Sequence, residues 1–207
     1  MVALPELHAV VEAPFSKGAW PWPIADRKPF SLIRLSGVST MAEIGSVVAQ
    51  LVKYNLGESE STAVGLLTRA VAAKSLLLPG GIQACAGERE INPSCCCGLE
   101  GWRAWSECRE SGTSPWMGHD PTPHIEWAGE LVRVWSDGGQ SAVADAVAVG
   151  FGRGRFVAEL SRVERDLRAF LPRLAEWASA HDFPDSSALC RKFDACFGIT
   201  GPAAGHD

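Results

Sequence analysis

The clearest pattern in the chain is a run of apolar residues at helical spacing in its last third. Apolar side chains recur every three or four positions from Phe156 to Trp177, and charged side chains fall between them. This spacing predicts an amphipathic helix with one buried stripe. Pro172 lies inside the run, and we expect a kink or a break there because proline removes a backbone N–H.

Three other segments show the same helical spacing more briefly. Apolar positions over 41–52 follow Thr40, a residue type that caps helices well. Residues 64–72 and 186–197 form two further short amphipathic patterns. Together with the long run, these patterns predict helices near both ends of the chain.

The middle of the chain contains short segments typical of strands. They are 76–78, 124–127, 131–135 and 146–151. Gly129 separates two of them as a hairpin turn, and Pro79-Gly80-Gly81 predicts a tight turn after the first. Helices and strands lie in separate runs without regular βαβ alternation. We therefore predict an α+β fold, in which a short antiparallel strand meander packs with flanking helices.

Length and composition favour one globular domain over residues 1–200. The chain has 207 residues, of which 46% are hydrophobic and 21% charged, so it can bury a core without disulfides or a metal. Residues 1–30 are rich in Pro and Trp and predict an extended segment that wraps onto the core. Residues 201–207 are expected to form a flexible tail.

Charge and hydropathy exclude several classes of protein. The formal net charge is −5, so no basic footprint for nucleic acid is present. No stretch of 18 apolar residues predicts a membrane span, and the first 15 residues lack the pattern of a signal peptide. We therefore expect a cytoplasmic protein whose seven cysteines are mostly reduced.

The three consecutive residues Cys95–Cys97 are the most unusual feature. With Asn92 as N-cap and Pro93 at the first helical position, they would lie in the first turn of a short helix, whose positive end lowers a thiol pKa. The apolar stripe of that helix would be Leu99, Trp102, Trp105 and Cys108. Three interpretations stay open: small buried side chains, metal ligands, or reactive thiols. We favour burial, because free cysteine is among the most buried residue types.

The metal interpretation points to zinc. Its candidate ligands are Cys95, Cys97, Cys108, His119 and His124, and Cys85 is a further possible donor. The two histidines have a spacing found in zinc sites, although no Cys-x2-Cys pair accompanies them. Without this zinc, no cofactor is expected.

Two loops carry other candidate chemistry. Gly150–Gly154, with Arg153 and Arg155, lies between a predicted strand and a predicted helix, where backbone amides can bind an anion. We favour an ordinary turn, because the sequence is neither a P-loop nor a dinucleotide motif.

A second loop holds adjacent His119 and Asp120. Adjacent side chains on a strand point to opposite faces, so we do not expect a catalytic dyad there. Trp116, with Met117 and His119, is a candidate protein-binding anchor because an aromatic residue in a rigid loop suits that role.

Four short stretches of the sequence resemble a family of hypothetical proteins from high-GC soil bacteria. They are Leu77–Gly81, Asn92–Glu100 with its Cys-Cys-Cys-Gly-Leu-Glu run, Gly118–Pro121 and Val163–Leu171. No activity is established for that family, so the resemblance assigns no catalytic residue. The meander with flanking helices is also similar to bacterial toxin-immunity proteins, a likeness of fold only.

No enzyme signature emerges, so we predict a non-catalytic cytoplasmic protein that binds another protein, as an immunity or antitoxin-like partner does. The alternative is a zinc-binding or thiol-dependent protein or enzyme centred on Cys95–Cys97 and on His119 with His124. A third hypothesis is a ligand-binding domain that uses Gly150–Gly154. The sequence does not predict an oligomeric state.

Overall fold

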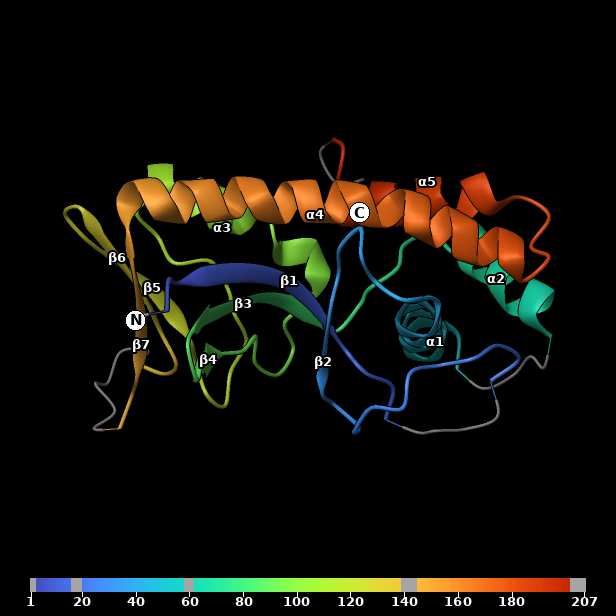
Figure 1. The fold of residues 1–207 in the computed structure, drawn as a ribbon, viewed down its shortest axis with the longest axis horizontal. Coiled ribbons are helices and arrows are strands. Elements are labelled where there is room, and N and C mark those ends of the chain that lie inside the picture. Colours follow the sequence, from blue (N-terminus) through green and yellow to red (C-terminus); the bar gives the residue numbers. More distant parts are fainter. Residues whose placement is uncertain (1–2, 16–19, 58–61, 139–144, 202–207) are drawn as a thin grey trace. The chain divides into compact units, whose positions relative to one another are not determined.

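The computed structural model describes residues 3–15, 20–57, 62–138 and 145–201. The helices labelled in Figure 1 are α1 (Met41–Leu56), α2 (Ala63–Ala72), α3 (Ala104–Ser111), α4 (Arg153–Ala180) and α5 (Ser186–Phe197), and the 3₁₀ turn η1 (Leu99–Gly101) precedes α3. The strands are β1 (Glu6–Glu12), β2 (Leu32–Arg34), β3 (Gly80–Ala86), β4 (Arg89–Ile91), β5 (His124–Ala128), β6 (Leu131–Trp135) and β7 (Ala148–Gly152). The predicted α+β class is confirmed.

The strands form two sheets, and the chain divides into two compact units. One sheet has the order β2-β1-β3-β4 and the other is the meander β5-β6-β7. One unit joins the residues up to Val10 with Gly80–Arg165, and the other joins Val11–Pro79 with the residues from Asp166 onward. Both β1 and α4 therefore begin in one unit and end in the other. The predicted tail, 201–207, lies outside the described residues except for Gly201.

The predicted hairpin and third strand are confirmed. Ile125 pairs with Val134 across β5 and β6, and Val134 pairs with Val149 across β6 and β7. All three side chains are buried, so one face of this sheet supplies the core of its unit. Gly129 makes the hairpin turn at a φ of 63°, a left-handed value that glycine adopts at little cost.

The four helices predicted near the two ends of the chain form where expected, and α1 begins with a capping box. Thr40 accepts a hydrogen bond from the Glu43 N–H, and the Glu43 carboxylate accepts one from the Thr40 N–H. Helix α4 continues through Pro172, so the predicted break does not occur. The apolar stripe of α4 is buried and consists of Phe156, Leu160, Val163, Leu167, Phe170, Leu174 and Trp177.

Three local predictions were wrong. Residues 76–78 form no strand, and β3 begins at Gly80 inside the predicted turn, where Gly80 and Gly81 have positive φ values of 153° and 145° that glycine adopts at little cost. Strand β1 was not predicted. Residues 92–98 form a loop, so Cys95–Cys97 precede η1 and do not lie in a helical turn.

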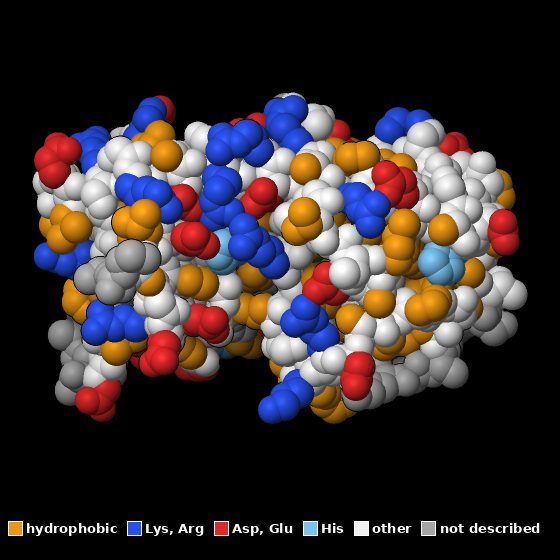
Figure 2. All heavy atoms as spheres, viewed as in Figure 1, with side chains coloured by type: hydrophobic (Ala, Val, Ile, Leu, Met, Phe, Trp, Pro, Cys, Tyr) orange, Lys and Arg blue, Asp and Glu red, His pale blue; other side chains and the backbone are white. Residues whose placement is uncertain are grey.

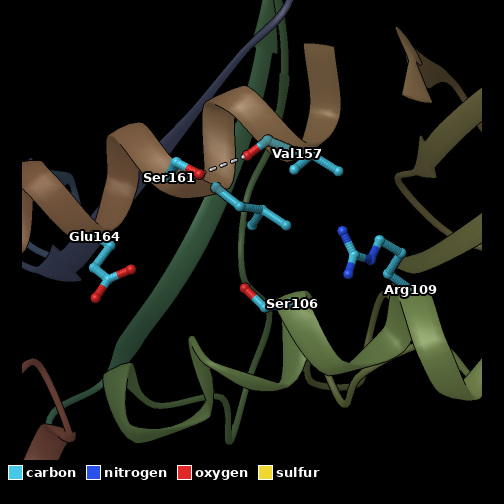
Figure 3. A pocket seen from close by; sticks show the side chains of 6 residues that line it. Ser106, Arg109, Val157, Ser161 and Glu164 are labelled. Atoms are coloured by element: carbon cyan, nitrogen blue, oxygen red, sulfur yellow. Dashed lines mark hydrogen bonds between the residues drawn. The ribbon is translucent and has the colours of Figure 1, made fainter. Parts of the chain in front are cut away.

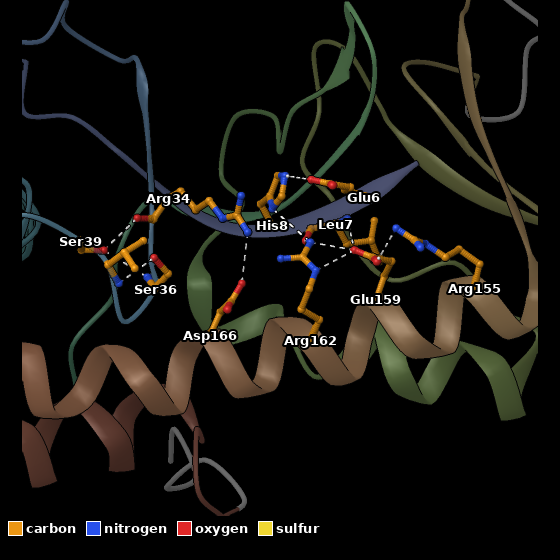
Figure 4. Close-up of polar contacts among 11 residues, drawn as sticks. Glu6, Leu7, His8, Arg34, Ser36, Ser39, Arg155, Glu159, Arg162 and Asp166 are labelled. Atoms are coloured by element: carbon orange, nitrogen blue, oxygen red, sulfur yellow. Dashed lines mark hydrogen bonds and ion pairs between the residues drawn. The ribbon is translucent and has the colours of Figure 1, made fainter. Parts of the chain in front are cut away.

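Polar side chains of α4 bind the backbone of β1 within one unit. The Glu159 carboxylate accepts a hydrogen bond from the Leu7 N–H at 3.1 Å, and the Arg162 guanidinium donates one to the Leu7 carbonyl. Figure 4 shows Glu159 between Arg155 and Arg162, with N···O distances of 2.9 and 2.7 Å. Glu159 is only 5% exposed, so its charge depends on these partners.

Candidate functional site

The Cys95–Cys97 loop is held against a second loop by backbone pairing. The Ser94 N–H donates to the Met117 carbonyl at 2.9 Å, and the His119 N–H donates to the Cys95 carbonyl at 3.2 Å. Cys95 and His119 thus form an isolated antiparallel β-bridge. The Ser94 hydroxyl donates to the His119 carbonyl at 2.7 Å. These contacts place His119 directly beside the cysteines.

The close approach of the two loops requires a glycine at position 118. Gly118 has a φ of 97°, and a Cβ built on it would lie 2.5 Å from the Ser94 carbonyl carbon. Any other residue would therefore meet backbone atoms that cannot move aside alone.

A tight turn exposes the first two cysteines. The Cys97 N–H donates to the Ser94 carbonyl at 3.2 Å, which closes a turn with Cys95 and Cys96 at its corners. Cys96 has a φ of 63°, uncommon for a residue with a side chain. Both corner cysteines are exposed, so the favoured interpretation of buried side chains is wrong for them.

Cys95, Cys96 and His119 converge. Their sulfurs are 3.5 Å apart, and the two sulfurs and one ring nitrogen of His119 all lie within 4.8 Å of one another. Donors around a tetrahedral zinc ion lie about 3.5–3.8 Å apart, given Zn–S and Zn–N distances of about 2.3 and 2.0 Å. The spacing of the three donors therefore fits a shared ion with little movement.

Asp120 orients the imidazole. Its Oδ2 lies 3.0 Å from His119 Nδ1, an arrangement that leaves Nε2 for a ligand. The expectation that these adjacent side chains diverge was wrong, because Asp120 has a φ of 54° and does not continue a strand. Hydrogen bonds with Asp120 and Cys96 raise the pKa of the His119 imidazole. Hydrogen bonds with Cys95 and His119 lower the pKa of the Cys96 thiol.

Cys97 lies outside the cluster. Its Sγ is 3.9 Å from the Trp116 carbonyl, and the residue is half-buried. Burial, with the nearby Glu100 charge, raises the pKa of the Cys97 thiol to about 11. Among the described residues, the sulfurs that converge with the His119 ring are those of Cys95 and Cys96, so Cys97 is not a ligand in this geometry.

Two other predicted zinc ligands are not brought to the cluster. Cys108 is buried in α3, where its thiol donates to the Trp105 carbonyl at 3.0 Å, and burial raises its pKa to about 11. His124 stacks on Trp135 with ring centroids 6.3 Å apart. Within the described residues, the only group of three or more such donors is Cys95, Cys96 and His119.

The predicted protein-binding residues divide between surface and interior. Trp116 is 60% exposed, whereas Met117 is buried at 2%. The Trp116 ring lies 6.3 Å from the His119 ring. Trp116 thus borders the cluster at the surface. Met117 is buried, so it cannot take part in the predicted protein-binding anchor.

The arginines at the glycine-rich turn, Gly150–Gly154, contact other residues of their own unit. The Arg153 N–H donates to the Glu130 carbonyl at 2.8 Å, and its guanidinium lies 5.5 Å from the centre of the Trp127 ring. Arg155 pairs with Glu159. These groups already have partners, so the geometry does not favour an anion site at Gly150–Gly154.

One pocket lies between α3 and the first half of α4, and no residue of the cluster lines it (Figure 3). Its lining residues are Ser106, Arg109, Val157, Leu160, Ser161 and Glu164. The Ser161 hydroxyl donates to the Val157 carbonyl at 3.1 Å, so it is already used within the helix. On the face shown in Figure 2, acidic and basic side chains are interspersed.

No family model, curated protein or solved structure matches the chain. Among the described helices, none is long and apolar enough to cross a bilayer. The geometry of the Cys95, Cys96 and His119 cluster is therefore the main indication of function.

Proposed function

We propose that this protein binds one zinc ion through Cys95, Cys96 and His119. The observation that supports the proposal is the convergence of two sulfurs and a ring nitrogen within 4.8 Å. Two thiolates and an imidazole suit a borderline-soft cation such as zinc better than magnesium or calcium, which prefer oxygen ligands.

Three protein ligands leave the fourth position of a tetrahedral ion for water or a ligand. Asp120 would hold the His119 ring in place through its contact with Nδ1. A zinc ion bound in this way would supply Lewis acidity and lower the pKa of a bound water. The exposure of Cys95 and Cys96 keeps that position accessible from solvent.

The test is zinc stoichiometry and affinity in the purified full chain. We expect about one zinc per chain by elemental analysis after reconstitution, and loss of that zinc in Cys96→Ser and His119→Ala. Cys97→Ser is the matched control, because it removes the neighbouring sulfur that lies outside the cluster. Zinc retained by Cys96→Ser, or lost equally from Cys97→Ser, would contradict the proposal.

A second candidate is a non-catalytic role in binding a protein partner. It is supported by the 60% exposure of Trp116 in the paired loop. A photo-cross-linking residue at position 116 should capture one defined protein in cells, whereas the same residue at exposed Tyr54 should not. Equal labelling from both positions would reject this candidate. No residue of the site favours an immunity-like partner, and we do not propose one.

A further inference from the structure

Cys95 and Cys96 differ from the other cysteines in two respects. Both are exposed, whereas Cys108 and Cys196 are buried and the remaining three are half-buried. Their sulfurs lie 3.5 Å apart, so a movement of about 1.5 Å would bring them to the S–S distance of a disulfide, about 2.05 Å.

We propose that Cys95 and Cys96 form a reversible disulfide when the protein meets a peroxide, and that this modification empties the zinc site. The first half concerns the two thiols alone. The second half rests on the proposed zinc function, because the disulfide would remove two of its three donors.

The reaction balances with hydrogen peroxide as the oxidant. One sulfur attacks a peroxide oxygen, the O–O bond breaks, and a sulfenic acid and one water form. The second sulfur then attacks the sulfenic sulfur, the S–S bond forms, and the hydroxyl group leaves as a second water with the second thiol proton. Two thiols and one peroxide thus yield one disulfide and two waters. When zinc is bound, the two protons come from solvent and the ion is released.

The spacing of the two residues makes the bond easy to reverse. Adjacent Cα atoms are about 3.8 Å apart, below the usual disulfide range of about 4.4–6.8 Å. A strained and exposed disulfide is the kind that ordinary thiol reductants open readily. The tight turn compensates in part for this strain, because it already directs both sulfurs to the same side.

The experiment treats the metal-free full chain with a small excess of hydrogen peroxide. The peptide that contains Cys95–Cys97 should lose the mass of two hydrogens, resist alkylation at two cysteines, and recover fully with a thiol reductant. Cys97→Ser should behave like the wild type, whereas Cys96→Ser should show no such loss. A bond that involves Cys97, or direct formation of sulfinic acid at Cys95 or Cys96, would overturn the proposal.

A second arm repeats the treatment on zinc-loaded protein with a chromogenic chelator present. About one zinc should appear per disulfide formed, in both the wild type and Cys97→Ser. Disulfide formation without zinc release would overturn the second half alone. If the protein binds no zinc, the proposed function fails, but the metal-free arm still tests the disulfide. If zinc binds and no disulfide forms, this inference fails and the proposed function stands.

Discussion

At the scale of single residues, Asp120 is the support of the site. Its carboxylate lies 3.0 Å from His119 Nδ1 and fixes the orientation of the ring. We expect Asp120→Ala to weaken zinc binding by about 10–100-fold, the usual effect of removing a carboxylate behind a histidine ligand. Competition with a chelator of known affinity measures the change. Glu110→Ala, at a side chain that is 81% exposed and pairs with Arg109, is the control and should bind zinc as the wild type does.

The chemistry of individual residues was predictable only in part. The sequence predicts Cys95 and His119 as zinc ligands, but the predicted ligand set lacks Cys96, and the strand rule predicts that the Asp120 side chain points away from His119. Cys96 and Asp120 both have positive φ, at 63° and 54°. Spacing rules assume that neighbours follow a helix or a strand, and these two residues follow neither.

At the scale of elements, the pairing of two loops creates the site, and Gly118 permits the pairing. We expect Gly118→Ala to lower the free energy of unfolding by about 1–3 kcal/mol and to weaken zinc binding, because the new Cβ meets the Ser94 backbone. Gly154→Ala is the matched control. It has open space around it at the start of α4, and we expect it to raise stability by about 0.5 kcal/mol. Urea denaturation measures both, and equal effects would contradict the argument.

The contacts between α4 and β1 depend on the charge of Glu159. Burial alone would raise the pKa of Glu159, but hydrogen bonds from Arg162 and the Leu7 N–H, with the charges of Arg162 and Arg155, lower it below 4.5. The carboxylate therefore contributes stability above that pH, and the contribution is lost as the pH falls through the folded-state pKa.

We expect Glu159→Gln to lower the free energy of unfolding at pH 7 by about 1–3 kcal/mol, because it removes the negative charge that faces two partly exposed arginines. The difference from the wild type should shrink as the pH falls below about 4.5, the ordinary value for a glutamate. Urea denaturation across this pH range is the measurement. A difference that stays constant with pH would show that the charge is unimportant.

Elements with clear periodicity were predictable, and those without it were not. The alternation of apolar and polar residues over β5 and β6 correctly predicts two strands, and the apolar stripe of α4 correctly predicts a helix. Strand β1 has five consecutive buried residues, His8 among them, so it lacks the alternation that marks a half-buried strand. The predicted strand at 76–78 failed because the two glycines after it extend into β3 and do not turn.

At the scale of the whole molecule, each of the two units consists of two separate segments of the chain, and the segments of the two units alternate along the sequence. The segment Gly80–Arg165 contains the cluster of Cys95, Cys96 and His119 but lacks β1, to which Glu159 and Arg162 bind. We expect this segment, expressed alone and kept metal-free, to show no cooperative unfolding transition by circular dichroism. The full chain, measured under the same conditions, should show one. A cooperative transition in the segment would mean that β1 is dispensable.

Composition and length predicted one domain over residues 1–200, and they could not reveal this alternation. Domain boundaries are recognised from linkers between consecutive segments. Here the units exchange within β1 and within α4, at Val10 and Arg165. Neither position carries the Gly, Pro or Ser enrichment that marks a linker, because both lie inside regular secondary structure.

The contact between Leu7 and Glu159 has a consequence for biosynthesis. The two residues are 152 positions apart, and translation at about 5–20 residues per second separates their appearance by about 8–30 s. During this interval the newly made apolar strand has no helix to bind its backbone. An unpaired strand edge of this kind is prone to aggregate, so the chain is most vulnerable before residue 159 has been made.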